Sequence, residues 1–229
     1  MKANSFGEPT QLTYTKTSYM NEFKSFSFEK QDEFVNFLFD KDGGSFLDIA
    51  CGHPINGSNT YSLESRGWIG VGFDIIDCEL NGWSKIRKSP FFQLDATSED
   101  LTKSLRDNLK DKLVDYVSLD VDVGGWMEKN LSPAVLPRIL DAGVSFKCAT
   151  IEHESFKYGP SGRDYMRGLL LEKGYVMLFE DISFHSGSSF EDWWINPLFF
   201  SDDILSIKNK SINYEQAVSF VKKFNSPTT

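Results

Sequence analysis

The chain has 229 residues, of which 40% are hydrophobic and 14% aromatic. That length is enough to bury one sizeable core, and such aromatic content is not typical of disordered chains. The formal net charge is −9 and no basic run stands out. Nucleic acid and anionic membrane surfaces both require clustered Lys and Arg, so we expect neither as a partner.

The cysteines and the N-terminal sequence indicate the cellular compartment. The three cysteines, Cys51, Cys78 and Cys148, form no CxxC pair, which argues against a disulfide framework and a structural zinc site. The polar N-terminus does not look like a secretory signal, and no apolar run approaches the ~20 residues that span a bilayer. We therefore expect a cytoplasmic protein. Its composition leaves open whether it forms a homo-oligomer.

Apolar periodicity predicts alternating helices and strands. Residues 1–27 are interpreted as an N-terminal arm and residues 28–229 as one domain. Residues 28–40 carry apolar side chains at helical spacing, and Gly43-Gly44 ends that pattern. Short apolar runs follow at residues 45–50, 69–74, 91–94, 114–121, 146–151 and 175–179, separated by helix-length segments at 58–66, 98–110, 126–141 and 162–173.

Strands that alternate with helices predict a parallel sheet covered on both faces, which is a three-layer α/β sandwich. Towards the C-terminus, residues 175–182 and 190–195 look like two adjacent strands and predict an antiparallel pair at the sheet edge. Residues 213–224 read as an amphipathic helix that closes the domain.

Ligands of such sheets bind outside the carboxyl ends of the strands. The first strand ends with Asp48 and is followed by Gly52, where the backbone can approach a ligand closely. The stretch is not GxGxxG, so no glycine cluster addresses a pyrophosphate. This favours a cofactor without phosphate, although a plain strand-to-helix turn explains the same residues.

Two further acids follow strands. Asp74 ends the second strand about 25 residues after the first motif, where an acid can meet a ribose hydroxyl. Asp95 could accept a hydrogen bond from an adenine amino group, but it could equally cap the helix that Thr97 and Ser98 open.

Asp120 and Asp122 end the most apolar strand and lie two residues apart, so they share a face. Two acids at a strand end that face a cleft cost folding free energy unless they are paired or serve a function. They could contact a cofactor ammonium group or a substrate. They could also hold a metal ion, as in a metal-dependent glycosyltransferase that uses a nucleotide sugar.

Histidines and tryptophans complete the candidate site. His153, flanked by Glu152 and Glu154, could act as a general base. His53 and His185 also follow strand ends and would lie at the same edge. Trp193 and Trp194 could wall a substrate pocket or pack the sheet edge.

Several of these segments together resemble one family. Residues 45–75 read SFLDIACGHPINGSNTYSLESRGWIGVGFDI, which resembles the opening of the FkbM-type methyltransferases, with Ser58-Asn59-Thr60, Leu63-Glu64 and Gly67-Trp68-Ile69-Gly70 as matching positions. Residues 114–125, Ile151-Glu152-His153, residues 170–175 and Glu191-Asp192-Trp193-Trp194 resemble later family segments in the same order. The loop Cys51-Gly52-His53-Pro54, Asp122 and Val123 depart from the family pattern.

The resemblance implies a Rossmann-like class I methyltransferase fold with seven strands, the last one antiparallel. It implies S-adenosylmethionine (SAM) as cofactor, with Asp48 and Gly52 in its loop, Asp74 on the ribose, Asp95 on the adenine and Asp120 near the methyl group. Ala50, Asn59 and Ala96 are further predicted cofactor contacts. Family members often methylate hydroxyls of sugars or other small molecules.

The predicted enzyme therefore methylates a small-molecule or saccharide hydroxyl. His153 is its expected base, oriented by Asp120, Asp122 or Glu152. His53, His185, Trp193 and Trp194 are its expected substrate contacts. Mg²⁺ on Asp122 and Glu152 is a variant of this hypothesis. A non-catalytic ligand-binding module on the same fold is the alternative from another class.

Overall fold

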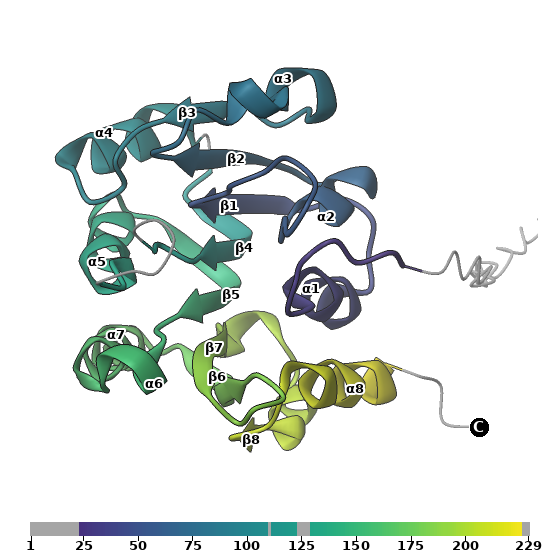
Figure 1. The fold of residues 1–229 in the computed structure, drawn as a ribbon. Helices are drawn as coiled ribbons and strands as arrows, with labels where there is room; N and C mark the ends of the chain where they lie inside the picture. The colour runs from purple at the N-terminus through teal and green to yellow at the C-terminus, as the bar shows by residue number, and fades with distance from the viewer. Residues whose placement is uncertain (1–22, 110, 123–128, 226–229) are drawn as a thin grey trace, which may run out of the picture.

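A computed structural model describes residues 23–109, 111–122 and 129–225 (Figure 1). Most of the predicted arm, 1–27, and the first residues of the predicted helix 126–141 lie outside these ranges. Residues 23–27 pack onto the domain, because the carboxylate of Asp32 accepts hydrogen bonds from Ser25 Oγ at 2.5 Å and from the backbone N–H of Phe26 at 2.8 Å.

One sheet organises the molecule. Its strands are β1 (Ser45–Ile49), β2 (Ile69–Asp74), β3 (Phe91–Gln93), β4 (Leu113–Leu119), β5 (Ser145–Glu152), β6 (Val176–Ser183), β7 (Ser189–Ile195) and β8 (Asn209–Lys210). They lie in the order β3-β2-β1-β4-β5-β7-β6-β8. β7 runs antiparallel to both neighbours, and every other pairing is parallel.

The expected number of seven strands is wrong by one, because the described chain has eight. β8 consists of Asn209 and Lys210 alone and pairs with Phe179 and Glu180 of β6. Because two polar residues carry no apolar alternation, the sequence pattern could not predict this strand.

Helices cover both faces of the sheet (Figure 1). They are α1 (Gln31–Phe39), α2 (Tyr61–Ser65), α3 (Trp83–Ile86), α4 (Glu99–Asn108), α5 (Ser132–Asp141), α6 (Ser155–Tyr158), α7 (Ser161–Glu172) and α8 (Tyr214–Asn225), with 3₁₀ turns at Cys78–Asn81, Pro197–Phe199 and Asp202–Ile207. α4, α5 and α7 share one core with the sheet, while α1 and α8 share the other. None of the described helices combines the length and apolar character needed to cross a bilayer.

The strand order locates the place where a ligand can enter. From β1 the chain continues to β2 and β3 on one side, whereas β4, β5 and the antiparallel strands lie on the other. β1 and β4 are direct neighbours, with Asp48 opposite Ser118. The loops that leave two such strands diverge, and the crevice between them is the usual ligand site of an open α/β sheet.

Candidate cofactor and acceptor site

The loop that follows β1 has an open backbone beside the crevice. Ala50 and Gly52 both have positive φ, at 63° and 58°, a conformation that favours glycine. The N–H of Gly52 donates to Asp74 Oδ2 at 2.8 Å. A Cβ placed on Gly52 would meet no atom within 4 Å. Space therefore exists for a ligand against this backbone.

A buried network of hydrogen bonds holds the β1 loop in place. Asp48 accepts a 2.6 Å hydrogen bond from Thr60 Oγ1, which in turn accepts one from Arg87 at 2.8 Å. The guanidinium of Arg87 forms a 2.5 Å ion pair with Glu64 and donates to the carbonyl of Pro54. Burial raises the pKa of Asp48. The Asp48 carboxyl therefore stabilises the loop through its hydrogen bond with Thr60. Sequence reasoning did not single out Arg87.

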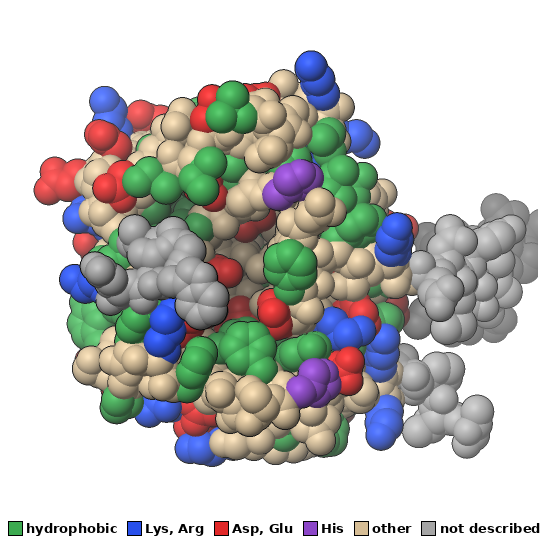
Figure 2. All heavy atoms as spheres, viewed as in Figure 1, with side chains coloured by type: hydrophobic (Ala, Val, Ile, Leu, Met, Phe, Trp, Pro, Cys, Tyr) green, Lys and Arg blue, Asp and Glu red, His purple; other side chains and the backbone are tan. Residues whose placement is uncertain are grey.

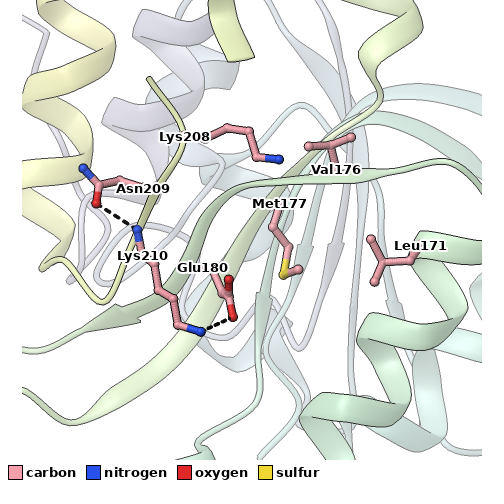
Figure 3. A pocket seen from close by; sticks show the side chains of 7 residues that line it. All are labelled: Leu171, Val176, Met177, Glu180, Lys208, Asn209 and Lys210. Atoms are coloured by element: carbon pink, nitrogen blue, oxygen red, sulfur yellow. Dashed lines mark hydrogen bonds and ion pairs between the residues drawn. The ribbon is translucent and has the colours of Figure 1, made fainter. Parts of the chain in front are cut away.

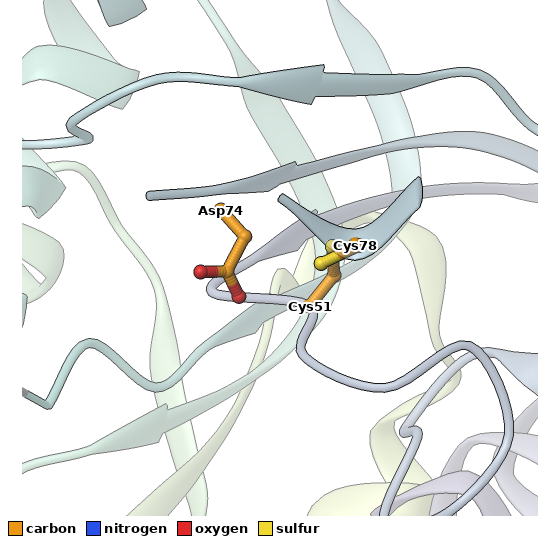
Figure 4. A group of neighbouring side chains, drawn as sticks. All are labelled: Cys51, Asp74 and Cys78. Carbon is orange, nitrogen blue, oxygen red and sulfur yellow. The ribbon is translucent and has the colours of Figure 1, made fainter. Parts of the chain in front are cut away.

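Asp74 lies at the end of β2, across from the loop that carries Cys51 (Figure 4). Oδ1 accepts from the N–H of Ile76 and Oδ2 from that of Gly52, both at 2.8 Å. Cys51 and Cys78 are buried free thiols, with sulfur atoms within 4.8 Å of a carboxylate oxygen of Asp74. The carboxylate is held rigidly, and each oxygen keeps one lone pair for a ligand hydroxyl.

The remaining predicted cofactor contacts differ in position. Asn59 donates from Nδ2 to Ser118 Oγ at 3.0 Å, so its side chain joins the β1 loop to β4. Ala96 is buried after β3. Asp95 is exposed, and its Oδ1 accepts from both the N–H and the hydroxyl of Thr97. The Asp95 side chain thus closes a turn with Thr97 and does not cap α4, whose N-cap residue is Ser98.

Acidic side chains gather at the other half of the crevice. Carboxylate oxygens of Asp120, Asp122 and Glu152 lie within 4.8 Å of one another. Glu152 of β5 is the direct partner of Glu191 in β7. Figure 2 shows a hollow near the middle of one face of the molecule, with acidic side chains in it and around it.

The surroundings of Asp120 bring the pKa of its carboxyl close to neutral pH. The surrounding protein displaces much of the water around its carboxylate, and Asp122, Glu29, Glu154 and Asp48 add negative charge. Together these effects raise the pKa of Asp120 to about 7. Its side chain is nevertheless exposed to solvent. An exposed carboxyl that titrates near neutrality is suited to exchange a proton with a bound molecule.

His153 has other partners than expected. Its Nδ1 accepts from the N–H of Ser155 at 3.1 Å, and its buried Nε2 lies 3.7 Å from Asp192 without a hydrogen bond. Asp192 is also bound by Arg167 through two 2.7 Å hydrogen bonds, and the interactions with His153 and Arg167 lower the pKa of Asp192 to about 2. The carboxylate beside His153 is therefore Asp192, rather than Asp120, Asp122 or Glu152, and neither ring nitrogen is open to a ligand.

The other two sequence-predicted histidines do not converge with His153. His53 and His185 follow β1 and β6, whose carboxyl ends share an edge. However, His53 caps its own turn by accepting from the N–H groups of Ile55 and Asn56. The exposed His185 lies against Tyr214 of α8. We therefore see no shared histidine site at this edge.

The expectation that Trp193 and Trp194 contact substrate is corrected by their burial. Trp193 is 0% and Trp194 1% exposed, and they pack into the two cores on opposite faces of the sheet. Alternation along β7 separates them, and the helices on both faces cover them. Trp193 acts instead as a donor, with Nε1 2.5 Å from Glu191 Oε2.

Sequence reasoning did not single out three residues near these acids as site residues, namely Gln31, Glu29 and Glu191. Gln31, at the start of α1, donates from Nε2 to Glu191 Oε2 at 3.3 Å and forms a hydrogen bond with Glu29. Gln31 and Glu191 are 160 positions apart. No motif connects them, so only the folded sheet brings them together.

A pocket of about 460 Å³ lies elsewhere, along α7, β6 and β8 (Figure 3). Leu171, Val176 and Met177 give it an apolar side, and Lys210 forms a 2.7 Å ion pair with Glu180 at its rim. None of the predicted site residues lines this pocket.

Comparison with known proteins defines the fold class. No protein-family model and no curated protein matches the sequence. Solved structures do match, and they show that this chain has the Rossmann-like fold of the class I SAM-dependent methyltransferases.

Three of these structures have a TM-score of 0.52. A Clostridium thermocellum protein described as an rRNA methylase is 14% identical, over 75% of this chain and 98% of that one. A class I SAM-dependent methyltransferase from Listeria monocytogenes is 13% identical, over 85% and 69%. Human methyltransferase-like protein 13, solved with SAH, is 10% identical, over 88% and 92%. At such low identity they establish the fold alone, so the FkbM resemblance and the exclusion of nucleic acid stay predictions.

Proposed function

We propose that this protein is a SAM-dependent methyltransferase that acts on a small molecule. The observation that carries the proposal is the open backbone at Gly52, held by Asp74 at the junction of β1 and β2. The fold adds support, since its switch point between β1 and β4 lies beside the same loop.

The residues present fit this cofactor. Asp74 would accept hydrogen bonds from the ribose hydroxyls through its remaining lone pairs, and the Gly52 loop would lie against the ligand. When bound, SAM would supply an electrophilic methyl group on a sulfonium sulfur. The protein's own task is then to orient the acceptor and to take up a proton.

Asp120 is our proposed proton acceptor, in place of His153. Its exposed carboxyl has a pKa of about 7, whereas Nδ1 of His153 is occupied by Ser155 and Nε2 is buried. The prediction of a hydroxyl acceptor relied on His153 as base. Without that base, a sugar hydroxyl has no particular support among the described residues.

A metal-assisted version has one specific observation in its favour. Asp120, Asp122 and Glu152 offer oxygen ligands within 4.8 Å of one another, which suits a hard cation such as Mg²⁺. Methyl transfer that persists in excess chelator would rule this version out. A nucleotide-sugar glycosyltransferase is disfavoured by the methyltransferase fold. A non-catalytic binding module would bind SAH but show no turnover with any acceptor.

The cofactor site can be tested by calorimetry with SAH, the stable product. We expect Asp74→Asn to weaken SAH binding by tenfold or more, because the amide offers one acceptor oxygen instead of two. Asp77→Asn is the matched control, since Asp77 lies three residues further on and caps a 3₁₀ turn. Equal SAH affinity in wild type and Asp74→Asn would contradict the proposed site.

A further inference from the structure

Arg87 is a buried cation beside the proposed cofactor loop, and the function proposed above gives it no role. It is the C-cap residue of α3, and its side chain is 0% exposed. A guanidinium that is removed from water costs folding free energy unless its partners compensate for the lost hydration. The segments that its hydrogen bonds join therefore indicate what this buried charge does.

The hydrogen bonds of Arg87 fall into two groups. Nε donates to Glu64 Oε2 of α2 at 2.5 Å, in the ion pair that balances the charge. Nη1 donates to the carbonyl of Pro54 and to Ser58 Oγ, both at 3.2 Å, and Nη2 donates to Thr60 Oγ1 at 2.8 Å. One nitrogen thus meets the counterion, while the other two nitrogens meet the loop that follows β1.

Strained backbone in the loop after β1 requires support from other segments. Ala50, Gly52 and Gly57 have positive φ, at 63°, 58° and 75°, and for Ala50 this conformation is strained. The start of the loop is fixed to β2, because the carbonyl of Phe73 accepts from the N–H groups of Ala50 and Cys51. The hydrogen bonds of Arg87 fix the second half of the loop.

Arg87 is itself held in place and reaches β1 through the loop. Because Thr60 Oγ1 accepts from Arg87, its own hydrogen is directed to Asp48 Oδ2 at 2.6 Å. The guanidinium carbon lies 4.5 Å from the ring centroid of Trp83. That ring is fixed by a 2.8 Å hydrogen bond from Nε1 to the carbonyl of Ser89. Arg87 therefore joins α3, α2, the loop and β1 at one point.

We propose that Arg87 is a positioning residue for the cofactor, because it fixes the loop after β1 in the conformation that opens the Gly52 backbone to SAM. The proposal rests on the methyltransferase function proposed above. Arg87 acts through Pro54, Ser58 and Thr60, since its own side chain is fully buried.

A lysine at position 87 would keep the charge and lose this geometry. A guanidinium spreads its N–H donors over several nitrogens in one plane, whereas an ammonium group carries all its donors on a single nitrogen. One nitrogen can pair with Glu64, but it cannot also occupy the places of Nη1 and Nη2 beside the loop. Lysine therefore separates the charge of Arg87 from its positioning role.

The experiment compares two variants that change the same ion pair from opposite sides. Arg87→Lys keeps a cation for Glu64 and removes donors from the loop, so SAH binding in calorimetry should weaken by roughly fivefold or more. Glu64→Gln keeps Arg87 and its loop donors, so Tm should fall while SAH affinity changes by less than about twofold. Arg66→Lys is the control, since its ion pair with Asp42 lies at the surface, and it should match the wild type in both measurements.

A double variant keeps the test decisive if a single variant fails to fold. Arg87→Met combined with Glu64→Met removes both charges, and apolar replacement of a buried ion pair often preserves stability or improves it. We expect this variant to be folded by circular dichroism and to bind SAH roughly fivefold or more weakly than the wild type, because the loop acceptors lose their donors. A folded double variant with the SAH affinity of the wild type would refute the positioning role.

The outcomes separate the two proposals. If the wild type binds SAH, a loss of affinity that follows the loss of Tm in both single variants, or no loss in Arg87→Lys, refutes the positioning role and leaves the methyltransferase proposal intact. If the wild type does not bind SAH, the proposed function falls. Amide hydrogen exchange of residues 50–60 without ligand then decides the role of Arg87. Exchange should be faster in Arg87→Lys than in Glu64→Gln, and equal rates refute the proposal.

Discussion

At the scale of single residues, Asp120 combines exposure with a strongly shifted proton affinity. Its pKa of about 7 in the folded protein exceeds the ordinary value of 3.8. Well below pH 3.8 the carboxyl is protonated in both states, whereas above pH 7 the folded protein must hold a crowded negative charge. The carboxylate therefore destabilises the fold at high pH and has little effect at low pH.

Asp120→Asn, which mimics the protonated acid, should therefore stabilise the protein at pH 8. We expect a gain of about 1 kcal/mol, less than the full shift implies because an exposed carboxylate retains hydration. That gain corresponds to roughly 2–4 °C in Tm and should vanish near pH 4. Thermal unfolding at both pH values measures it, with Asp111→Asn as the exposed control. An equal gain at pH 4 and pH 8 would contradict the assignment.

The site residues that the sequence could predict are those that follow strands. The positions of Asp48, Asp74 and Asp120 are predictable because the carboxyl ends of parallel strands meet at one edge. Side-chain direction was not predictable. His153 turns to Asp192, and Gln31 reaches Glu191 across 160 positions, because both contacts depend on how helices and β7 pack on the sheet.

At the scale of elements, apolar periodicity predicted most strands closely. The predicted strand 69–74 coincides with β2, and the predicted tail helix 213–224 differs from α8 by one residue at each end. The predicted helix 28–40 begins later, at Gln31, because the residues just before α1 fold back onto the carboxylate of Asp32. Side-chain hydrogen bonds of this kind help to decide where an element begins and leave no apolar pattern.

Two glycines test how tightly these elements pack. A Cβ on Gly70 in β2 would lie 2.3 Å from the backbone oxygen of Phe46 in β1, so Gly70→Ala should destabilise the protein by about 1–3 kcal/mol. Gly168→Ala in α7 meets no atom within 4 Å. It should stabilise the protein by roughly 0.5–1 kcal/mol through helix propensity. Urea unfolding of both variants checks the prediction, and effects of equal sign would contradict it.

At the scale of the whole molecule, carboxylates dominate the dependence of stability on pH. The pKa is raised, mainly by burial, in Glu29, Asp32, Asp48, Asp120, Glu154 and Glu191. It is lowered, by hydrogen bonds and ion pairs, in Glu33, Asp115 and Asp192. The first group binds more protons in the folded than in the unfolded state between the two pKa values, so its contribution to stability falls as pH rises through that window.

We therefore expect the free energy of unfolding to be larger at pH 5.5 than at pH 8. Below pH 4 the trend reverses, because Asp192, with a folded pKa of about 2, must be protonated as the protein unfolds. Urea titrations followed by tryptophan fluorescence measure both limbs. Above neutral pH, self-repulsion from the net charge of −9 also lowers the free energy of unfolding. Repeating the titrations in about 0.5 M NaCl, where the Debye length is only ~4 Å, screens that long-range repulsion and leaves the local burial. A free energy that stays level or rises from pH 5.5 to pH 8 in high salt would show that the buried acids keep their ordinary proton affinity.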